Sequence, residues 1–187
     1  YVIDIAPGTY TEPASIQLED HVSLHGSGQQ TTILEAPSGA SAALRIDGTV
    51  STTIRDLTVR NTDVAAIGGV GIRIASTGVI ALTGVGAAAT GSETAVGIDV
   101  VSGSPSLTDV DAHASAEVAS IAISITTGSA SLTHAHASST GTGITVGMRV
   151  AGGTPIFTES TVNTTGGTNA SGIQVTGGSP VFDGGRF

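Results

Sequence analysis

The chain has 187 residues, a length that usually makes one domain, and a formal net charge of −9. Only six residues are Lys or Arg, all of them Arg, against 15 Asp and Glu. The sequence therefore lacks the basic patches that nucleic acids and anionic membranes require. It has no Cys, which excludes disulfides and thiol nucleophiles, and no apolar run of about 18 residues, which excludes a helical membrane span. We therefore expect neither a nucleic-acid partner nor membrane insertion.

Residues 1–42 contain short alternating apolar segments separated by turn residues, beginning with VIDIAPGTYTE at positions 2–12. Alternation predicts strands, and Pro7 with Gly8 predicts a corner. The chain opens inside this pattern without an initiator Met or a signal segment, and its last residue, Phe187, falls partway through a repeat. We expect a piece of a longer chain, with chain continuation or end-to-end contact at both open ends.

From residue 43 onward the sequence repeats with a period of about 25 residues. Each copy holds a small residue, an alternating apolar pair, a turn of Gly, Ser or Pro, a further apolar position and a third short alternating stretch. A looser copy begins at Ala43, and the regular copies read GIRIASTGVIALTGVGA from Gly71, GIDVVSGSPSLTDVDA from Gly97, AISITTGSASLTHAHA from Ala122, GMRVAGGTPIFTESTV from Gly147 and GIQVTGGSPVFDGGRF from Gly172.

Three short strands in each copy predict one rung of a parallel β-helix, in which neighbouring rungs stack at roughly 4.8 Å. We expect one all-β domain over residues 1–187, of about seven rungs, irregular over 1–42 and regular over 43–187. Stacking places like residues of successive copies in inward columns, which should hold the most buried side chains. These columns are Ile72/Ile74, Ile98/Val100, Ile123/Ile125, Met148/Val150 and Ile173/Val175 on the first strand and Leu82, Leu107, Leu132, Phe157 and Phe182 on the second, continued by Leu44, Ile46 and Ile54.

This rung pattern resembles the right-handed parallel β-helix of the pectin-lyase-like superfamily, which includes enzymes as well as many non-enzymatic surface and fibre proteins. The N-terminal part has a more specific resemblance. Its segments IAPGTYTE, VSLHGSGQQTTIL and TIRDLTVRNT resemble the first rungs of pectin methylesterases. The right-handed coil is implied by this resemblance and by the general handedness of parallel connections.

The catalytic motifs of these families are absent. The resemblance to pectin methylesterases implies a Gln-Asp-Thr motif, but Asp follows none of the Gln residues, which stand at positions 17, 29, 30 and 174. The polygalacturonase Asn-Thr-Asp motif is matched by Asn61-Thr62-Asp63, yet Val64 follows in place of Gly and the other motifs of that family are missing. A pectate-lyase Ca²⁺ site needs more carboxylates than one per rung. We predict no catalytic residue and no cofactor.

The outward side of the first strand carries a column of polar residues that is a candidate ligand site. Arg73 is expected to lie beside Asp99. One interpretation is a surface ladder of ion pairs. The other is a shallow groove in which Arg holds the carboxylates or sulfates of a polysaccharide or cell-surface glycan. The candidate ligand-binding residues are Arg45, Arg73, Asp99, Arg149 and Gln174.

Histidines and acids recur at two further repeat positions. Asp109, His134 and Glu159 share one position, and Asp111 and His136 share another with Thr161, so these groups should be neighbours on successive rungs. They are either solvent-facing corner residues supported by adjacent carboxylates or a divalent-metal site. The metal hypothesis names the ligands Asp109, Asp111, His134 and His136.

The absence of catalytic motifs on a regular scaffold favours a non-catalytic structural or adhesive module of a secreted or cell-surface protein. The alternative is a carbohydrate-binding or carbohydrate-active protein that uses the first-strand face.

Overall fold

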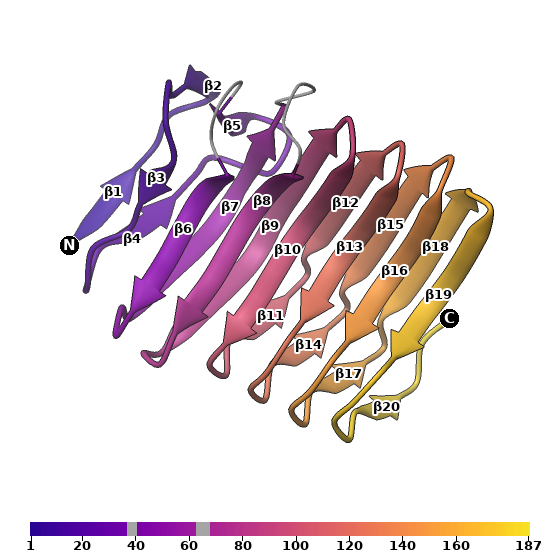
Figure 1. Ribbon diagram of the computed structural model, residues 1–187. Helices are drawn as coiled ribbons and strands as arrows, with labels where there is room; N and C mark the ends of the chain where they lie inside the picture. Colours follow the sequence, from indigo (N-terminus) through magenta and orange to yellow (C-terminus); the bar gives the residue numbers. More distant parts are fainter. Residues whose placement is uncertain (37–40, 63–67) are drawn as a thin grey trace.

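The computed structural model describes residues 1–36, 41–62 and 68–187, and these residues form a single coil of parallel strands with no helix among them. The strands stack side by side along the coil axis, with the two termini at opposite ends (Figure 1). The described residues contain no helix that could span a membrane. The fold expected from the repeat, a parallel β-helix of about seven turns, is confirmed.

The first strand of each turn belongs to one seven-stranded sheet, which we call the first-strand sheet. All of its neighbouring strands pair in parallel. Its members are β3 (Ile16–Gln17), β6 (Ala42–Gly48), β8 (Gly68–Ser76), β10 (Thr94–Ser102), β13 (Ala119–Ile125), β16 (Ile144–Val150) and β19 (Asn169–Val175).

The other two sides of the coil form a second, 13-stranded sheet, because β7 and β9 are long enough to pass around a corner and belong to both sides. The second side consists of β1 (Val2–Asp4), β4 (Ser23–His25), β7 (Thr52–Asn61), β9 (Ile80–Gly91), β11 (Ser106–Thr108), β14 (Ser131–Thr133), β17 (Ile156–Thr158) and β20 (Val181–Asp183). The third side adds β2 (Gly8–Thr11), β5 (Thr32–Ala36), β12 (Asp111–Ala116), β15 (His136–Gly141) and β18 (Thr161–Gly166) to the far halves of β7 and β9.

The strand register reproduces the sequence period. Ile98 pairs with Ile72, 26 residues earlier, whereas Leu107 pairs with Leu82, 25 residues earlier. Across the corner between these two pairs the offset first rises to 27 residues, where β10 bulges after Val100 and Ser102 pairs with Ala75, and then falls to 25, where Ser106 pairs with Ala81. A corner therefore absorbs the one-residue difference between copies, and the inward columns stay aligned on both sides of it.

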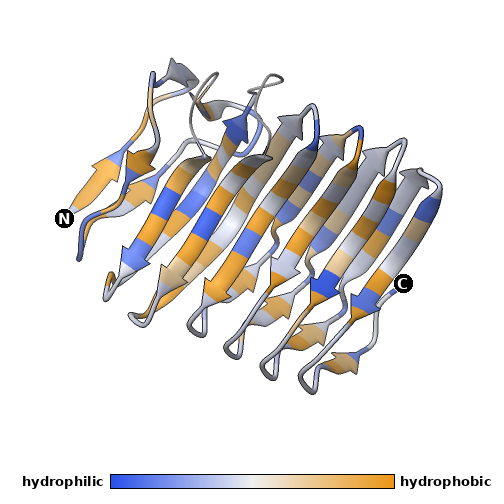
Figure 2. Ribbon diagram, viewed as in Figure 1, coloured by the Kyte–Doolittle hydropathy of each residue, from blue (hydrophilic) through white to orange (hydrophobic). Residues whose placement is uncertain are grey.

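The predicted columns form the core over most of the coil. Side chains from Leu44 to Phe157 in these columns are fully buried, and hydrophobic and hydrophilic residues alternate along the strands of the first-strand sheet (Figure 2). On the third side the inward residues Ala87, Ala112 and Ala137 are also fully buried. A regular stack with such small side chains explains how a chain with 3% aromatic residues fills its interior.

The prediction of full burial is wrong for the last turn. Val175 is 47% exposed and Phe182 is 39% exposed, and Ile173 is only partly buried. These residues keep their places in the columns, and the ring of Phe182 stacks on that of Phe157 with centroids 4.9 Å apart. They are exposed because this turn has a stacked neighbour on one side only.

Candidate functional site

The outward polar column of the first-strand sheet lies in register from one end of the coil to the other. Arg73 is the direct neighbour of Asp99, and Asp99 is followed by Ser124. The predicted ligand-binding residues therefore form one line along the coil axis. In order, the column reads Gln17, Arg45, Arg73, Asp99, Ser124, Arg149 and Gln174.

Asp47, two residues along β6 from Arg45, joins the two arginines at the N-terminal part of this column. Nη2 of Arg45 lies 2.8 Å from Asp47 Oδ2, and Nη1 of Arg73 lies 2.5 Å from Asp47 Oδ1. The three side chains are 27–37% exposed. Because Arg45 and Arg73 are direct neighbours on adjacent strands, the Asp47 carboxylate separates two like charges that would otherwise repel each other.

Asp99 has a different environment from Asp47. Its half-buried position raises the pKa of the carboxyl group, while a hydrogen bond with Ser124 and the charges of Arg73 and Arg149 oppose that rise. Within the described residues Asp99 has no ion pair shorter than 4.0 Å, since the guanidinium of Arg73 turns to Asp47 instead. Arg73 and Asp99 are thus neighbours in register, as predicted, but the close ion pair joins Arg73 to Asp47.

The C-terminal part of the column is more open. Arg149 and Gln174 are exposed, and they lie on neighbouring strands directly beyond Ser124. In the described part of the chain Arg149 makes no ion pair within 4.0 Å, although its charge acts on Asp99. This end of the column can offer a guanidinium and an amide to an external acidic group.

The corner between the second and third sides carries the first histidine group. Nε2 of His134 lies 2.8 Å from Glu159 Oε2, and its Nδ1 lies 3.2 Å from Asp109 Oδ1. The hydrogen bond with Glu159 is the main cause, and that with Asp109 the second, of a raised pKa of His134. The two carboxylates lie on opposite edges of the imidazole ring, so they do not converge on one point.

The second histidine group lies two residues further along the chain. Nδ1 of His136 is 3.0 Å from Asp111 Oδ1, and Thr161 follows in register. The structure therefore divides the four candidate metal ligands into two pairs, His134 with Asp109 and His136 with Asp111. Among the described residues no group of three His, Asp or Glu side chains has an arrangement that could hold a metal ion.

The corner also has a backbone conformation that the sequence pattern did not reveal. Asp109, His134 and Glu159 have φ angles of 52°, 52° and 49°, in the left-handed region. Asp56, with a φ of 56°, and Gly84, with a φ of 61°, occupy the same corner in earlier turns. The side chains at this position project outward in one row, which is why the imidazole and the carboxylates meet.

Asn61 belongs to the tripeptide that matches the polygalacturonase motif. Its side chain is buried, 1% exposed, and its amide donates a hydrogen bond to the carbonyl of Val70 at 3.2 Å. Asp63 lies outside the described residues. The amide of Asn61 therefore has a structural role inside the coil.

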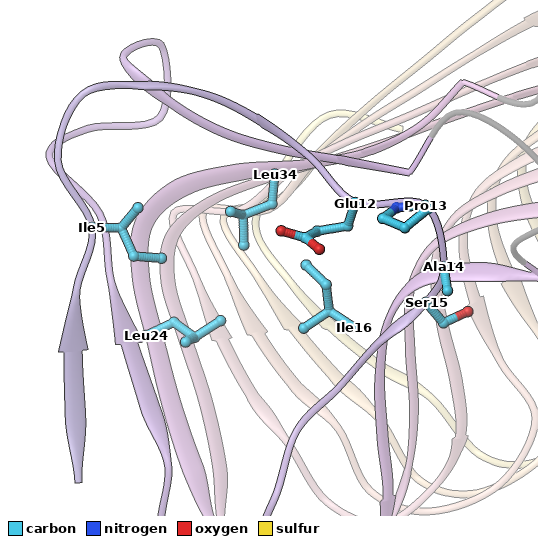
Figure 3. A pocket seen from close by; sticks show the side chains of 8 residues that line it. All are labelled: Ile5, Glu12, Pro13, Ala14, Ser15, Ile16, Leu24 and Leu34. Atoms are coloured by element: carbon cyan, nitrogen blue, oxygen red, sulfur yellow. The ribbon is translucent and has the colours of Figure 1, made fainter.

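An apolar cavity of about 370 Å³ lies at the N-terminal end of the coil. Figure 3 shows Ile5, Leu24 and Leu34 facing Ile16 across it, with the carboxylate of Glu12 directed toward the same space. Sequence reasoning did not identify this cavity, because it forms among the irregular first turns, outside the regular repeat. Its lining consists of Ile5, Glu12, Pro13, Ala14, Ser15, Ile16, Leu24 and Leu34.

Comparison with solved structures identifies the architecture. A pectin methylesterase from Yersinia enterocolitica superposes with a TM-score of 0.61 at 15% sequence identity, over 92% of this chain and 63% of that protein. The chain has the fold of a pectin-methylesterase-like parallel β-helix. The expected resemblance is confirmed for the fold alone at this identity.

The other comparisons add little to this. A pectin methylesterase from carrot aligns at 14% identity with a TM-score of 0.42, over 100% of this chain and 76% of that protein. No family model matches the sequence, and no significant match was found among curated proteins. The chain spans 63% of the length of the Yersinia esterase.

Proposed function

We propose that this β-helix is a non-catalytic adhesive module of a secreted or cell-surface protein and that its first-strand face binds an acidic polysaccharide. One observation carries the proposal: three of the six Arg of a chain with a net charge of −9 lie in a single column of the first-strand sheet. These residues are Arg45, Arg73 and Arg149. Three positive charges thus lie on one face of an otherwise acidic molecule, against the two carboxylates of Asp47 and Asp99.

The spacing of the column favours a polymer over a small ligand. Arg73 and Arg149 are separated by three strand spacings, roughly 14 Å along the coil axis. A linear polysaccharide lying along that axis can reach both guanidinium groups, and Arg forms paired hydrogen bonds with carboxylates or sulfates. Gln174, one strand beyond Arg149, extends the line.

The state of the acids on this face favours binding without catalysis. Glycoside hydrolysis uses two carboxyl groups that flank one bond. Asp47 is held by ion pairs with both Arg45 and Arg73, so its oxygens are engaged. Asp99 is therefore the acid of this column that is not held in an ion pair. Its described neighbours in the column are Arg73 and Ser124, so no second free carboxylate lies next to it.

The proposal can be tested by affinity electrophoresis through gels that contain polygalacturonate or a neutral polysaccharide. Migration should be retarded by the acidic polymer only, and Arg149→Ala should reduce the retardation. Arg55→Ala is the matched control, because Arg55 is exposed on the second side of the coil and contacts His25. Equal retardation by the neutral polymer, or an equal effect of the control variant, would count against this function.

Asp99 supports a second candidate, a carbohydrate-active protein. A partly buried carboxyl with a raised pKa is the kind of group that can act as a general acid. This alternative expects release of methanol or of reducing ends from pectins, and loss of that activity in Asp99→Asn. An unchanged substrate after prolonged incubation with the wild-type protein would reject it.

We also propose that the end turns make end-to-end contacts with a further copy of the chain. Ile3 on β1 is 49% exposed and Phe182 on β20 is 39% exposed, and each lies on an outermost strand of the stack. Such strands can pair with another chain. Sedimentation velocity should show concentration-dependent association that Ile3→Lys weakens, and a single species at all concentrations would contradict it.

A further inference from the structure

A polar hollow of about 280 Å³ lies on the third side of the coil, away from the first-strand face. Its floor is the far half of β9, which pairs with β7 on one side and with β12 on the other. This volume is just below that of most ligand pockets, which hold about 300 to 1,000 Å³, so it suits a small ligand. The residues that line it are Gln29, Gln30, Thr58, Arg60, Gly86, Ala87, Ala88, Asp111 and His113.

The hollow exists because one turn lacks outward side chains. In register, Gly86 lies between Thr58 and Asp111, and Ala88 lies between Arg60 and His113. The turns on either side therefore carry polar side chains, whereas the turn between them carries a hydrogen and a methyl group. The hydroxyl of Thr58 leans over Gly86 and leaves no room for a Cβ there, so the open part of the hollow lies beside Gly86 and over Ala88. The result is a slot one turn wide with polar walls.

A loop closes one end of the slot. The hydroxyl of Thr58 donates to the carbonyl of Gln29 at 2.7 Å, and the backbone N–H of Gly28 donates to the carbonyl of Asp56 at 2.8 Å. The side-chain amide of Gln29 then reaches the carbonyl of Asp109, 80 residues away in the sequence, at 3.4 Å. Gln29 thus crosses the turn that lacks side chains and is held at both ends.

The walls carry opposite charges with unused hydrogen-bonding capacity. With the described residues, the guanidinium of Arg60 makes no ion pair or hydrogen bond, and the same holds for the ring of His113. Asp111 uses Oδ1 for His136, and its Oδ2 has no hydrogen-bond partner in the described part of the chain. Arg60 and His113 face each other across Ala88, and Asp111 faces Thr58 across Gly86.

We propose that this slot binds a small zwitterion, with its carboxylate above Ala88 between Arg60 and His113 and its ammonium beside Gly86, between Asp111 and the hydroxyl oxygen of Thr58. The two positions are two residues apart on β9, which corresponds to roughly 6.6 Å. This separation suits an ω-amino acid, whose charged groups are several carbons apart, better than an α-amino acid. A simple anion would place its charge near Asp111 without compensation.

Titration calorimetry with a series of ω-amino acids tests the proposal. δ-Aminovalerate should bind. Glycine should bind at least about tenfold more weakly, because its two charges are too close together to span the two subsites. Valerate and pentylamine each keep only one of the two charges, so their affinities should be lower than that of δ-aminovalerate by a similar factor. Absence of δ-aminovalerate binding, or equal affinity for valerate, would overturn the proposal.

Three variants and a matched control connect binding to the slot. Ala88→Tyr should fill the slot and abolish binding. Arg60→Ala and Asp111→Asn should each lower the affinity for δ-aminovalerate about tenfold. Ser138→Tyr is the control, because Ser138 lies in the same column as Ala88 two turns further along. Circular dichroism verifies that each variant is folded. Binding that survives Ala88→Tyr, or that Ser138→Tyr removes equally, would refute this location.

Discussion

Arg73 and Asp47 belong to neighbouring turns of the coil, and the guanidinium of Arg73 donates to Asp47 Oδ1 at 2.5 Å. The same carboxylate accepts from Nε of Arg45 at 3.0 Å through Oδ2. One acid therefore pairs with two arginines that are direct neighbours in the sheet and offsets one of their two positive charges. This relationship sets both the stability of the N-terminal half of the first-strand face and the charge that it presents.

Replacing Asp47 with Asn should have two opposite effects. The variant loses two partly exposed ion pairs, and the repulsion between Arg45 and Arg73 is no longer offset by a carboxylate. The free energy of unfolding should therefore fall by about 1–2 kcal/mol. Affinity for polygalacturonate should rise, because both guanidinium groups become available. Chemical denaturation and titration calorimetry measure these effects, and Glu93→Gln, which changes the same charge at an exposed corner, is the control.

The Asp99 carboxyl should titrate above an unstructured Asp, whose pKa is 3.8. Since the folded-state pKa is raised, Asp99 favours the folded state most below the unfolded pKa, and stability falls as pH rises through the folded value. Ser124→Ala should raise the pKa of Asp99 further, because the hydrogen bond with Ser124 opposes the effect of burial. Carbon-13 NMR titration measures this, and a pKa below 3.8 in the wild type would contradict the account.

His134 should have a pH dependence of the same sign as that of Asp99, in a higher pH range. Its folded-state pKa is raised, chiefly by the hydrogen bond with Glu159, so the interaction stabilises the fold below the unfolded pKa of about 6.5 and is lost as pH rises through the folded value. Glu159→Gln should lower the pKa of His134. Proton NMR of the imidazole resonances measures it, with Glu117→Gln as control, and an unchanged pKa in Glu159→Gln would disagree with this geometry.

Core substitutions should be costly in the middle of the stack and mild at its end. Leu107 is fully buried between Leu82 and Leu132, so Leu107→Ala should lower the free energy of unfolding by about 2–5 kcal/mol. Val181 is 53% exposed, and Val181→Ala should cost well under about 1 kcal/mol. Urea denaturation compares the two variants, and similar losses would be inconsistent with the stacked core.

The inward columns could be predicted from the sequence because period and alternation together determine them. Ile98 and Ile123, for example, occupy equivalent places in their copies, and the sheet pairs them directly. Exposure in the last turn was not captured, since burial depends on neighbours on both sides. Val175 continues the repeat and is nevertheless exposed.

Contacts between outward side chains were harder to predict. The register correctly makes Arg73 the neighbour of Asp99, but an Arg side chain is long enough to reach Asp47 in the preceding turn instead. The left-handed corner at His134 was also missed. Gly84 and Gly184, at the same position of an earlier and a later turn, were signals that could have indicated it.

The polar hollow on the third side escaped sequence reasoning for a different reason. It depends on Gly86 and Ala88, small residues that carry no chemistry themselves, and on Gln29, which arrives from a distant loop. Only the folded register brings Arg60 and Asp111 to opposite walls of the same slot.

The central claim is that the arginine column of the first-strand face binds an acidic polysaccharide. Titration calorimetry of polygalacturonate against the wild type and the Arg73→Ala/Arg149→Ala double variant tests it most directly. The account predicts binding that weakens with added salt and falls at least about tenfold in the double variant. Wild-type affinity in the double variant, or no binding by the wild-type protein, would contradict the claim.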